Sequence, residues 1–272
     1  MAVVVGLFGS LIGSFLNVVV YRVPAGRSIV RPPSACGACG APIRWYDNVP
    51  VLSWIALRGR CRDCHAAISV RYPLVELGTA LAFTLVALLF LPAVLAATTP
   101  AAVAAGLLAL VAFLYLAAIS IALTLIDLDV HRLPNAITLP AYAVGALLLI
   151  PAALLAGEPA RLLGAAVGML ALAAFYLLLA VIRPGGMGMG DVKLAGVLGL
   201  FLGYLGWGPL IVGAFGAFLL GGAFSLALIV ARRAGRASRI PFGPWMLAGA
   251  WLGIVAGDWI AGGYLSFIGL GD

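Results

Sequence analysis

Residues 77–126, LGTALAFTLVALLFLPAVLAATTPAAVAAGLLALVAFLYLAAISIALTLI, form a run of 50 uncharged residues that decides the fold class. A helix needs about 20 apolar residues to cross a bilayer, so this run is long enough to cross twice. Thr98, Thr99 and Pro100 interrupt it with a turn signal. We therefore predict two membrane helices, over residues 74–97 and 102–126, joined by a tight turn.

Apolar residues dominate the rest of the chain as well. Of the 272 residues 64% are hydrophobic and only 9% are charged, against about 25% charged in a typical soluble domain. A soluble fold would have to expose much of that apolar surface, so we exclude one. We predict an all-α polytopic membrane protein with about eight transmembrane helices. Three of the other predicted spans are 1–21, 136–157 and 162–182. Residues 194–231 hold two more, a short one and a longer one separated by a break at 203–209, and the last span lies near 242–262.

We expect the first span to be a membrane helix and not a removable signal peptide, because residues 1–21 have no basic start and no small-residue cleavage site. The net charge of +7 is distributed unevenly. Fifteen of the 16 basic residues lie in alternate loops, within 22–73, at Arg132, within 183–193 and within 232–239. The positive-inside bias places these loops in the bacterial cytoplasm, at the inner membrane, with both termini outside. This topology explains the charge without nucleic acid and leaves membrane lipids as the partner of the basic loops.

Four cysteines lie in the first of these loops, as Cys36-x2-Cys39 and Cys61-x2-Cys64 with 21 residues between the pairs. Each pair can supply two corners of a zinc tetrahedron, so the spacing predicts a structural Zn²⁺ site without an open position for catalysis. Two disulfides or free thiols are the alternatives, and a cytoplasmic location argues against stable disulfides. His65 is expected at the surface and not as a ligand. We therefore divide the chain into a first helix (1–21), a four-cysteine zinc-binding domain (22–73) and a seven-helix membrane domain (74–272).

Two aspartates mark a candidate catalytic site. Asp127 ends the third predicted span and Asp191 opens the sixth, and the topology puts both at the same membrane face, where an acid costs about 2.5–3.5 kcal/mol to insert. Asp129 would face another side of a continuing helix. Gly188 and Gly190 allow backbone conformations closed to other residues and the close approach of a peptide. Two carboxylates that share one proton can activate water and protonate a carbonyl oxygen. Taken singly, each acid would be read as an interfacial cap in water.

Together these features resemble the bacterial type IV prepilin leader peptidases, which are membrane aspartic proteases of the GxGD kind. The matching elements run along nearly the whole chain. They are Gly13-Ser14-Phe15-Leu16-Asn17-Val18-Val19, Tyr21-Arg22-Val23-Pro24, the two CxxC pairs, Arg71-Tyr72-Pro73-Leu74-Val75-Glu76, Ile126-Asp127-Leu128-Asp129 with Leu133-Pro134, Gly186-Met187-Gly188-Met189-Gly190-Asp191-Val192-Lys193, and Ile240-Pro241-Phe242-Gly243-Pro244.

The resemblance implies cleavage of the basic leader of type IV prepilins or pseudopilins after a glycine, at the cytoplasmic membrane face. It places the catalytic pair at Asp127 and Asp191, with Gly188, Gly190 and Lys193 as active-site support. It also implies N-methylation of the new N-terminal residue with S-adenosylmethionine, since members with a cysteine loop are typically bifunctional. No dinucleotide-type glycine loop indicates where the methyl donor binds. Asn135 departs from the Leu-Pro-Asp of the family, which puts a role for that third acid in doubt.

Two other classes of function fit parts of the sequence. An ion-coupled transporter would also place acids beside broken-helix glycines, but the chain shows no inverted repeat and the cysteine pairs have no obvious role in transport. A non-enzymatic assembly factor would use the zinc loop to dock a pilus or secretion component. Cleavage of a purified prepilin by the solubilised protein separates the peptidase from both.

Overall fold

The structure is a computed structural model that describes residues 1–183, 185–232 and 240–269. As predicted, the described chain is built from helices, and its only β-structure is two isolated bridges. Eight of the helices are long. They are α1 (Ala2–Arg22), α3 (Arg71–Ala96), α4 (Pro100–Val130), α5 (Asn135–Leu155), α6 (Ala160–Ile182), α7 (Met189–Leu205), α8 (Trp207–Val230) and α9 (Gly243–Phe267).

Seven of these helices, within the described residues, are long and apolar enough to cross a membrane. The eighth, α7, has 17 residues, which is about 26 Å of helix and near the lower limit for a span. This short helix is buried among other helices, since the side chains of Leu194, Val197 and Phe201 are completely enclosed. The expectation of about eight membrane helices is thus met by seven full-length helices and one short, buried helix.

The chain divides into two compact units. The first consists of residues 1–96 and 113–122, and the second of residues 97–112 and 123–272. The middle of α4 therefore belongs to the first unit and its two ends to the second. The division into 1–21, 22–73 and 74–272 remains a prediction.

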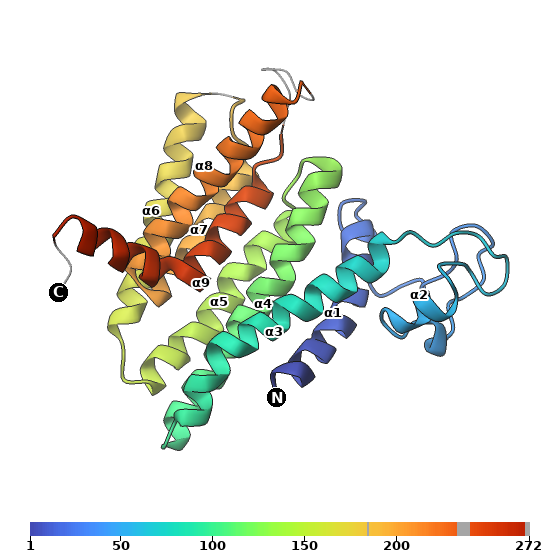
Figure 1. The fold of residues 1–272 in the computed structure, drawn as a ribbon, viewed down its shortest axis with the longest axis horizontal. Coiled ribbons are helices and arrows are strands. Elements are labelled where there is room, and N and C mark those ends of the chain that lie inside the picture. Colours follow the sequence, from blue (N-terminus) through green and yellow to red (C-terminus); the bar gives the residue numbers. More distant parts are fainter. Residues whose placement is uncertain (184, 233–239, 270–272) are drawn as a thin grey trace. The chain divides into compact units, whose positions relative to one another are not determined.

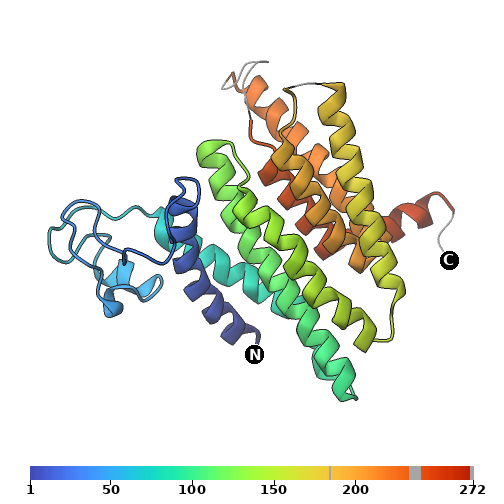
Figure 2. The ribbon, with the colours of Figure 1, turned by 180° about the vertical axis from the view of Figure 1, so that it is seen from behind.

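In the first unit, α1 and α3 lie along each other, with the cysteine segment at one end of the pair (Figures 1 and 2). Two glycines four residues apart on α1 allow this approach. A Cβ atom would lie 2.7 Å from Cβ of Phe83 if built on Gly9, and 2.7 Å from Cα of Glu76 if built on Gly13. Membrane helices use small residues in this way because close backbone contact replaces the hydrophobic driving force that water supplies.

Glu76 ties the cysteine segment to α3. Its side chain is only 8% exposed, and its Oε2 accepts a 2.7 Å hydrogen bond from the backbone N–H of Val51. Val51 directly precedes the short helix α2 (Leu52–Ala56) and has a φ of 61°. That conformation is costly for a β-branched residue, so the buried hydrogen bond helps to hold it.

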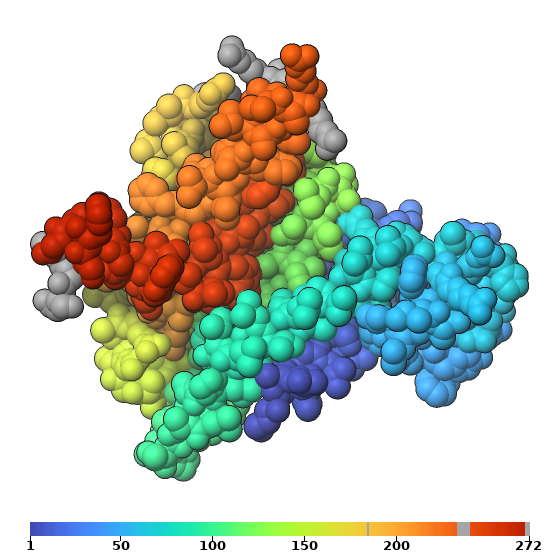
Figure 3. All heavy atoms as spheres, in the orientation of Figure 1, coloured from blue at the N-terminus to red at the C-terminus, as the bar shows by residue number. Residues whose placement is uncertain are grey.

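The second unit is built around two closely packed helix pairs, α6 with α7 and α8 with α9. In the first pair the backbones touch, since a Cβ atom on Gly168 would lie 2.4 Å from the carbonyl oxygen of Gly199. In the second pair a Cβ atom on Gly249 would lie 2.3 Å from the backbone nitrogen of Ala217. The space-filling view shows α8 in contact with the first part of α9 (Figure 3).

The helix ends correct three sequence expectations. Helix α4 continues to Val130, so Asp127 lies one turn inside the helix and does not end it. The break expected at 203–209 is the single residue Gly206, whose φ of 143° is open to glycine and not to L-residues in general. Helix α9 reaches Phe267, beyond the predicted end at 262. Of the basic loop predicted over 232–239, residues 233–239 lie outside the described chain.

Candidate active site and metal centre

Asp127 is a buried carboxylate held by the start of another helix. Its residue is 5% exposed, and its Oδ2 accepts a 3.1 Å hydrogen bond from the backbone N–H of Gly243, the first residue of α9. A Cβ atom on Gly243 would lie 2.7 Å from this same oxygen. Only glycine therefore lets the N–H approach the carboxylate at this distance. Pro244 follows within the first turn of α9, where proline favours helix initiation.

Asp191 is held in a similar way within its own helix. It is the third residue of α7, and its Oδ2 accepts a 3.0 Å hydrogen bond from the backbone N–H of Gly188, the residue that caps the helix. This is the second half of a capping box, in which an acid at the third position satisfies the N-terminal N–H. Asp191 is partly exposed, so its carboxylate is fixed and still accessible.

Asp191 lies within electrostatic reach of Asp127 in the second unit. Tyr176 of α6 is only 2% exposed, and its ring lies 6.3 Å from that of Phe242, the residue that precedes α9. By contrast, Asp129 is exposed on α4. The structure thus places Asp127 and Asp191 in the same unit and Asp129 on the exposed side of α4. That the first two form the catalytic pair stays a prediction.

The glycines of the GxGD segment act differently from our expectation. Gly188 has an ordinary extended backbone, with φ −82° and ψ 150°, and Gly190 is helical. Neither has a positive φ, so the expected unusual conformations are wrong. The requirement at Gly190 is for space, because a Cβ atom there would lie 3.1 Å from Cβ of Leu133.

Leu133 links the two halves of the site. It lies in the short connection between α4 and α5, beside Gly190. A Cβ atom on Gly243 would also lie 3.2 Å from Cδ2 of Leu133. One leucine therefore packs between the helix start that carries Asp191 and the helix start that holds Asp127.

Lys193 belongs to the same region, but its ammonium group binds an amide. Its Nζ donates a 2.9 Å hydrogen bond to Oδ1 of Asn135, the first residue of α5. Its backbone carbonyl accepts a 2.6 Å hydrogen bond from the hydroxyl of Tyr142. Lys193 thus fastens the first turn of α7 to α5 through both its side chain and its backbone.

The second site is the cysteine cluster of the first unit. The Sγ atoms of Cys36, Cys39, Cys61 and Cys64 all lie within 4.8 Å of one another, and those of Cys36 and Cys64 are 3.8 Å apart. All four cysteines are free thiols and not disulfides. A tetrahedral Zn²⁺ with Zn–S bonds of about 2.3 Å requires sulfur atoms about 3.8 Å apart. The four residues therefore fit a closed tetrahedral metal site.

The two cysteine pairs have the same local geometry. In each, the first cysteine donates its N–H to a carbonyl five residues on, at Ala41 or Ala66, and accepts an N–H from the fourth residue on. That fourth residue is Gly40 in one pair and His65 in the other, and both have a positive φ, of 72° and 58°. His65 is exposed and outside the sulfur cluster, so its place is a turn position and not a ligand position.

Backbone N–H groups prepare the first thiol for a metal. The N–H groups of Cys39 and Ala38 hydrogen-bond the Cys36 sulfur and lower the pKa of its thiol to about 6. A thiolate is the form that binds metal ions. Two ion pairs brace the same segment, between Arg62 and Asp47 and, at 2.8 Å, between Arg44 and Asp63.

The sequence analysis did not identify three residues near the candidate catalytic aspartates, namely Gly243, Leu133 and Tyr176. Gly243 lies in a quoted motif, and its Gly-Pro pair was a signal of a helix start. Leu133 was quoted only as part of the same resemblance. Tyr176 had no signal, because a single aromatic residue in an apolar span is ordinary.

Comparison with known families matches two separate parts of the chain. A family model described as the bacterial peptidase A24 N-terminal domain matches residues 7–90. A second, described as the type IV leader peptidase family, matches residues 114–226. The four cysteines fall in the first range, and Asp127 and Asp191 in the second. No solved structure matches the chain.

Several curated proteins are similar over nearly the whole chain. A prepilin leader peptidase/N-methyltransferase of Aeromonas salmonicida (strain A449) is 36% identical over 289 residues, covering 96% of this chain and 93% of its own length. A protein of the same name from Pseudomonas aeruginosa is 36% identical over 287 residues, covering 97% and 93%. A third, from Myxococcus xanthus, is 42% identical over 202 residues, covering 74% and 56%.

Proposed function

Because this chain belongs to the type IV leader peptidase family, we propose that it cleaves the leader from type IV prepilins or pseudopilins with Asp127 and Asp191 as the catalytic pair. One observation carries the assignment. Two aspartates 64 positions apart in the sequence lie within electrostatic reach of each other, and each accepts a hydrogen bond from the N–H of a glycine at the start of a helix. The family membership favours an enzyme over the transporter and the assembly factor.

The pair supplies an acid and a base. One carboxylate takes a proton from a water molecule, and the water oxygen bonds to the carbonyl carbon of the scissile peptide while the other, protonated, carboxyl group protonates the carbonyl oxygen. As the C–N bond of the resulting diol breaks, the carboxyl group that took the water proton gives it to the peptide nitrogen, and a diol hydroxyl returns its proton to the other carboxylate. The products are the leader with a new carboxyl group and the mature protein with a free amine. The buried Asp127 and the accessible Asp191 provide the unequal environments that such a division of roles requires.

The relatives' shared name supports a second activity, N-methylation of the newly exposed residue. S-adenosylmethionine as the methyl donor provides an electrophilic methyl carbon on a sulfonium sulfur. The free amine of the mature N-terminus attacks that carbon, the C–S bond breaks, and neutral S-adenosylhomocysteine leaves. The methylated nitrogen then releases one proton to water.

We further propose that the four cysteines hold a structural Zn²⁺. The sulfur spacing suits this ion, and the four thiolates would leave no open position on it. The metal would fix the segment of residues 22–73, which has few regular elements of its own. Its role here is therefore to shape this domain and not to activate water.

The chain is a multi-pass membrane protein. We propose that it lies in the bacterial inner membrane with the cysteine segment and the catalytic pair toward the cytoplasm. The distribution of the basic residues supports this orientation, since 15 of 16 fall in alternate loops. The same charge supports contacts with anionic membrane lipids and needs no nucleic acid.

The decisive experiment is cleavage of a purified prepilin by the detergent-solubilised protein, followed by mass spectrometry of the prepilin N-terminus. Asp127→Asn and Asp191→Asn should each abolish cleavage, while the matched control Asp129→Asn should retain most of it. A gain of about 14 Da that needs S-adenosylmethionine would establish the methyl transfer. Substantial cleavage by either of the first two variants would refute the catalytic assignment.

A further inference from the structure

The short helix α2 of the cysteine segment turns apolar side chains outward. Leu52 and Ile55 lie one turn apart on the helix and are 65% and 59% exposed, whereas Ser53 is buried. The hydroxyl of Ser53 donates a 2.9 Å hydrogen bond to the carbonyl oxygen of Tyr46, so its face of α2 packs against the neighbouring 3₁₀ turn. Trp45 begins that turn and is 83% exposed. A helix that faces water would show the opposite distribution.

A buried hydrogen bond places α2 beside the membrane-spanning helix α3. The N–H of Val51, which directly precedes α2, binds the carboxylate of Glu76. Glu76 lies five residues after Arg71, where α3 begins, and this corresponds to about 7.5 Å along the helix. In both ribbon views α2 lies beside the first part of α3 (Figures 1 and 2). The start of α2 is therefore level with the first turns of α3 and not beyond its end.

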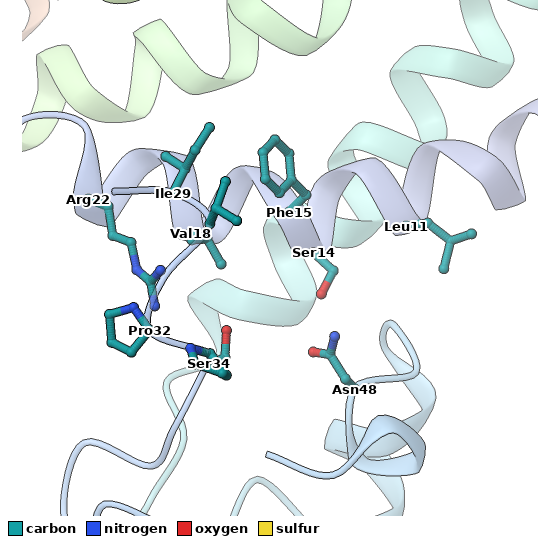
Figure 4. Close-up of a pocket in the computed structure, with 11 residues that line it drawn as sticks. Leu11, Ser14, Phe15, Val18, Arg22, Ile29, Pro32, Ser34 and Asn48 are labelled. Carbon is teal, nitrogen blue, oxygen red and sulfur yellow. The ribbon is translucent and has the colours of Figure 1, made fainter. Parts of the chain in front are cut away.

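The contacts with α1 lead to the same position. Asn48 and Ser14 lie on opposite sides of a hollow between α1 and the cysteine segment (Figure 4). Ser14 lies eight residues before Arg22, the last residue of α1, and this is about 12 Å along the helix. The cysteine segment thus folds back along the end of a membrane helix. Its exposed apolar side chains are carried to the level at which that helix enters the bilayer.

The charge of the cysteine segment is complementary to an anionic surface. Residues 22–73 contain eight arginines and two aspartates. Both aspartates are in ion pairs, one with Arg44 and the other with Arg62. Arg58 and Arg60 follow α2 closely, are exposed, and form no ion pair with any residue that the structure describes. Their guanidinium groups are available to phosphate, which such groups bind well.

We propose that α2 and Trp45 lie in the headgroup region of the bilayer that holds the protein, with Arg58 and Arg60 bound to the phosphates of anionic phospholipids. The inference rests on the proposed lipid contacts and names the surface that makes them. Tryptophan is favoured at this depth because its ring is apolar and its N–H is polar. An apolar helix face inserts about 5–10 Å into the same region. A basic leader peptide would be repelled by the unpaired arginines.

The test measures how close Trp45 is to lipid in the full-length, zinc-loaded protein. Nanodiscs of phosphatidylglycerol carry bromine either near the headgroup end or near the methyl end of the acyl chains, because bromine quenches tryptophan fluorescence on contact. The contribution of Trp45 is the fluorescence of the wild type minus that of Trp45→Phe. Bromine near the headgroups should lower it about twofold or more, and bromine near the methyl ends much less, since an interfacial side chain reaches only about 5–10 Å into the bilayer.

Trp54 of the same helix is the matched control. It is partly buried, and its Nε1 donates a 3.1 Å hydrogen bond to the carbonyl oxygen of Ile68. Its contribution, obtained from Trp54→Phe, should be quenched less than that of Trp45 by bromine at either depth. The double variant Leu52→Asp, Ile55→Asp should reduce the quenching of Trp45 to the level of Trp54. Bound zinc per chain and the thermal unfolding midpoint show which variants are folded.

The arginines are tested by changing the lipid. Quenching of Trp45 should be stronger in phosphatidylglycerol than in phosphatidylcholine, and the double variant Arg58→Gln, Arg60→Gln should remove this difference. Equal quenching of the wild type in both lipids would overturn the role of the arginines.

Prepilin cleavage in the same nanodiscs separates this inference from the proposed function. If the wild type cleaves prepilin and Trp45 is quenched no more than Trp54, the lipid contact is refuted and the peptidase stands. Trp45 would then face water or a protein partner. If Trp45 is quenched as expected and no prepilin is cleaved, the peptidase fails and the lipid contact stands.

Discussion

Replacing Gly243 by alanine should displace the carboxylate of Asp127 without unfolding the protein. The added Cβ would lie 2.7 Å from Oδ2 of Asp127, and an ordinary contact between carbon and oxygen is about 3.3 Å. The oxygen must therefore move by about 0.6 Å. A shift of that size would stretch the 3.1 Å hydrogen bond from the Gly243 N–H beyond the usual limit of about 3.2 Å.

The expected cost is catalytic. Misplacing a catalytic group by about 1 Å can lower a rate about 100-fold, so we expect Gly243→Ala to lower kcat/KM for prepilin cleavage roughly 30- to 100-fold, or about 2–2.7 kcal/mol. The loss should appear in kcat, because Asp127 acts on the bond that breaks. The thermal unfolding midpoint should change little, since the displaced atom is the end of a flexible side chain.

Gly262→Ala is the matched control, since Gly262 also lies in α9 and a Cβ atom there would meet nothing within 4 Å. It should cleave prepilin at the wild-type rate. Cleavage by Gly243→Ala within threefold of the wild-type rate would refute the claim that this glycine positions the aspartate. A large fall in its unfolding midpoint would show instead that the contact is structural.

Three further perturbations test other parts of the two sites. His65→Gly should bind zinc with unchanged or higher affinity, because glycine adopts the positive φ of 58° more readily. Competition with a chelator measures this affinity, and a loss of zinc would show that His65 is more than a turn residue. Lys193→Met and Asn135→Ala remove the same 2.9 Å hydrogen bond, so each should lower the rate of prepilin cleavage by a similar factor. The double variant should cleave no more slowly than either single variant, whereas additive losses would show that Lys193 has another role. Arg62 holds the pKa of Asp47 below its usual value, so the pair stabilises the cysteine segment above about pH 4 and less as the pH falls through the lowered pKa. Arg62→Gln should therefore lower the unfolding midpoint at pH 7 and lose its effect at acid pH; an effect constant over pH would exclude the ion pair as its cause.

The features that could be predicted from the sequence depend on short stretches of the chain. A membrane span is encoded by about 20 consecutive apolar residues, so the long helices could be placed to within a few residues. A cysteine pair is a single turn, so the metal-binding geometry also followed from the spacing. The error at the end of α4 has a physical cause. Hydropathy falls at Asp127, but the helical hydrogen bonds continue until His131, whose left-handed backbone, with φ 53°, ends the helix.

The features that could not be predicted are contacts between distant segments. Gly243 donates its N–H across 116 positions of the sequence to Asp127. Leu133 meets Gly190 and Gly243, which lie in two other segments. The GxGD glycines illustrate the difficulty, since the residue type suggested special backbone angles and the structure shows a need for space. A glycine in a sequence does not reveal which of these it serves.

These contacts also extend the proposed catalytic site beyond the range that the peptidase family model matches. That range ends at residue 226, before α9 begins at Gly243. Yet Gly243, the first residue of α9, donates the hydrogen bond to the buried Asp127 and also packs against Leu133. A chain shortened after residue 226 would keep both aspartates and lose the group that holds Asp127. Since the position of the carboxylate depends on that group, the proposed catalytic site requires α9 as much as it requires the two acids.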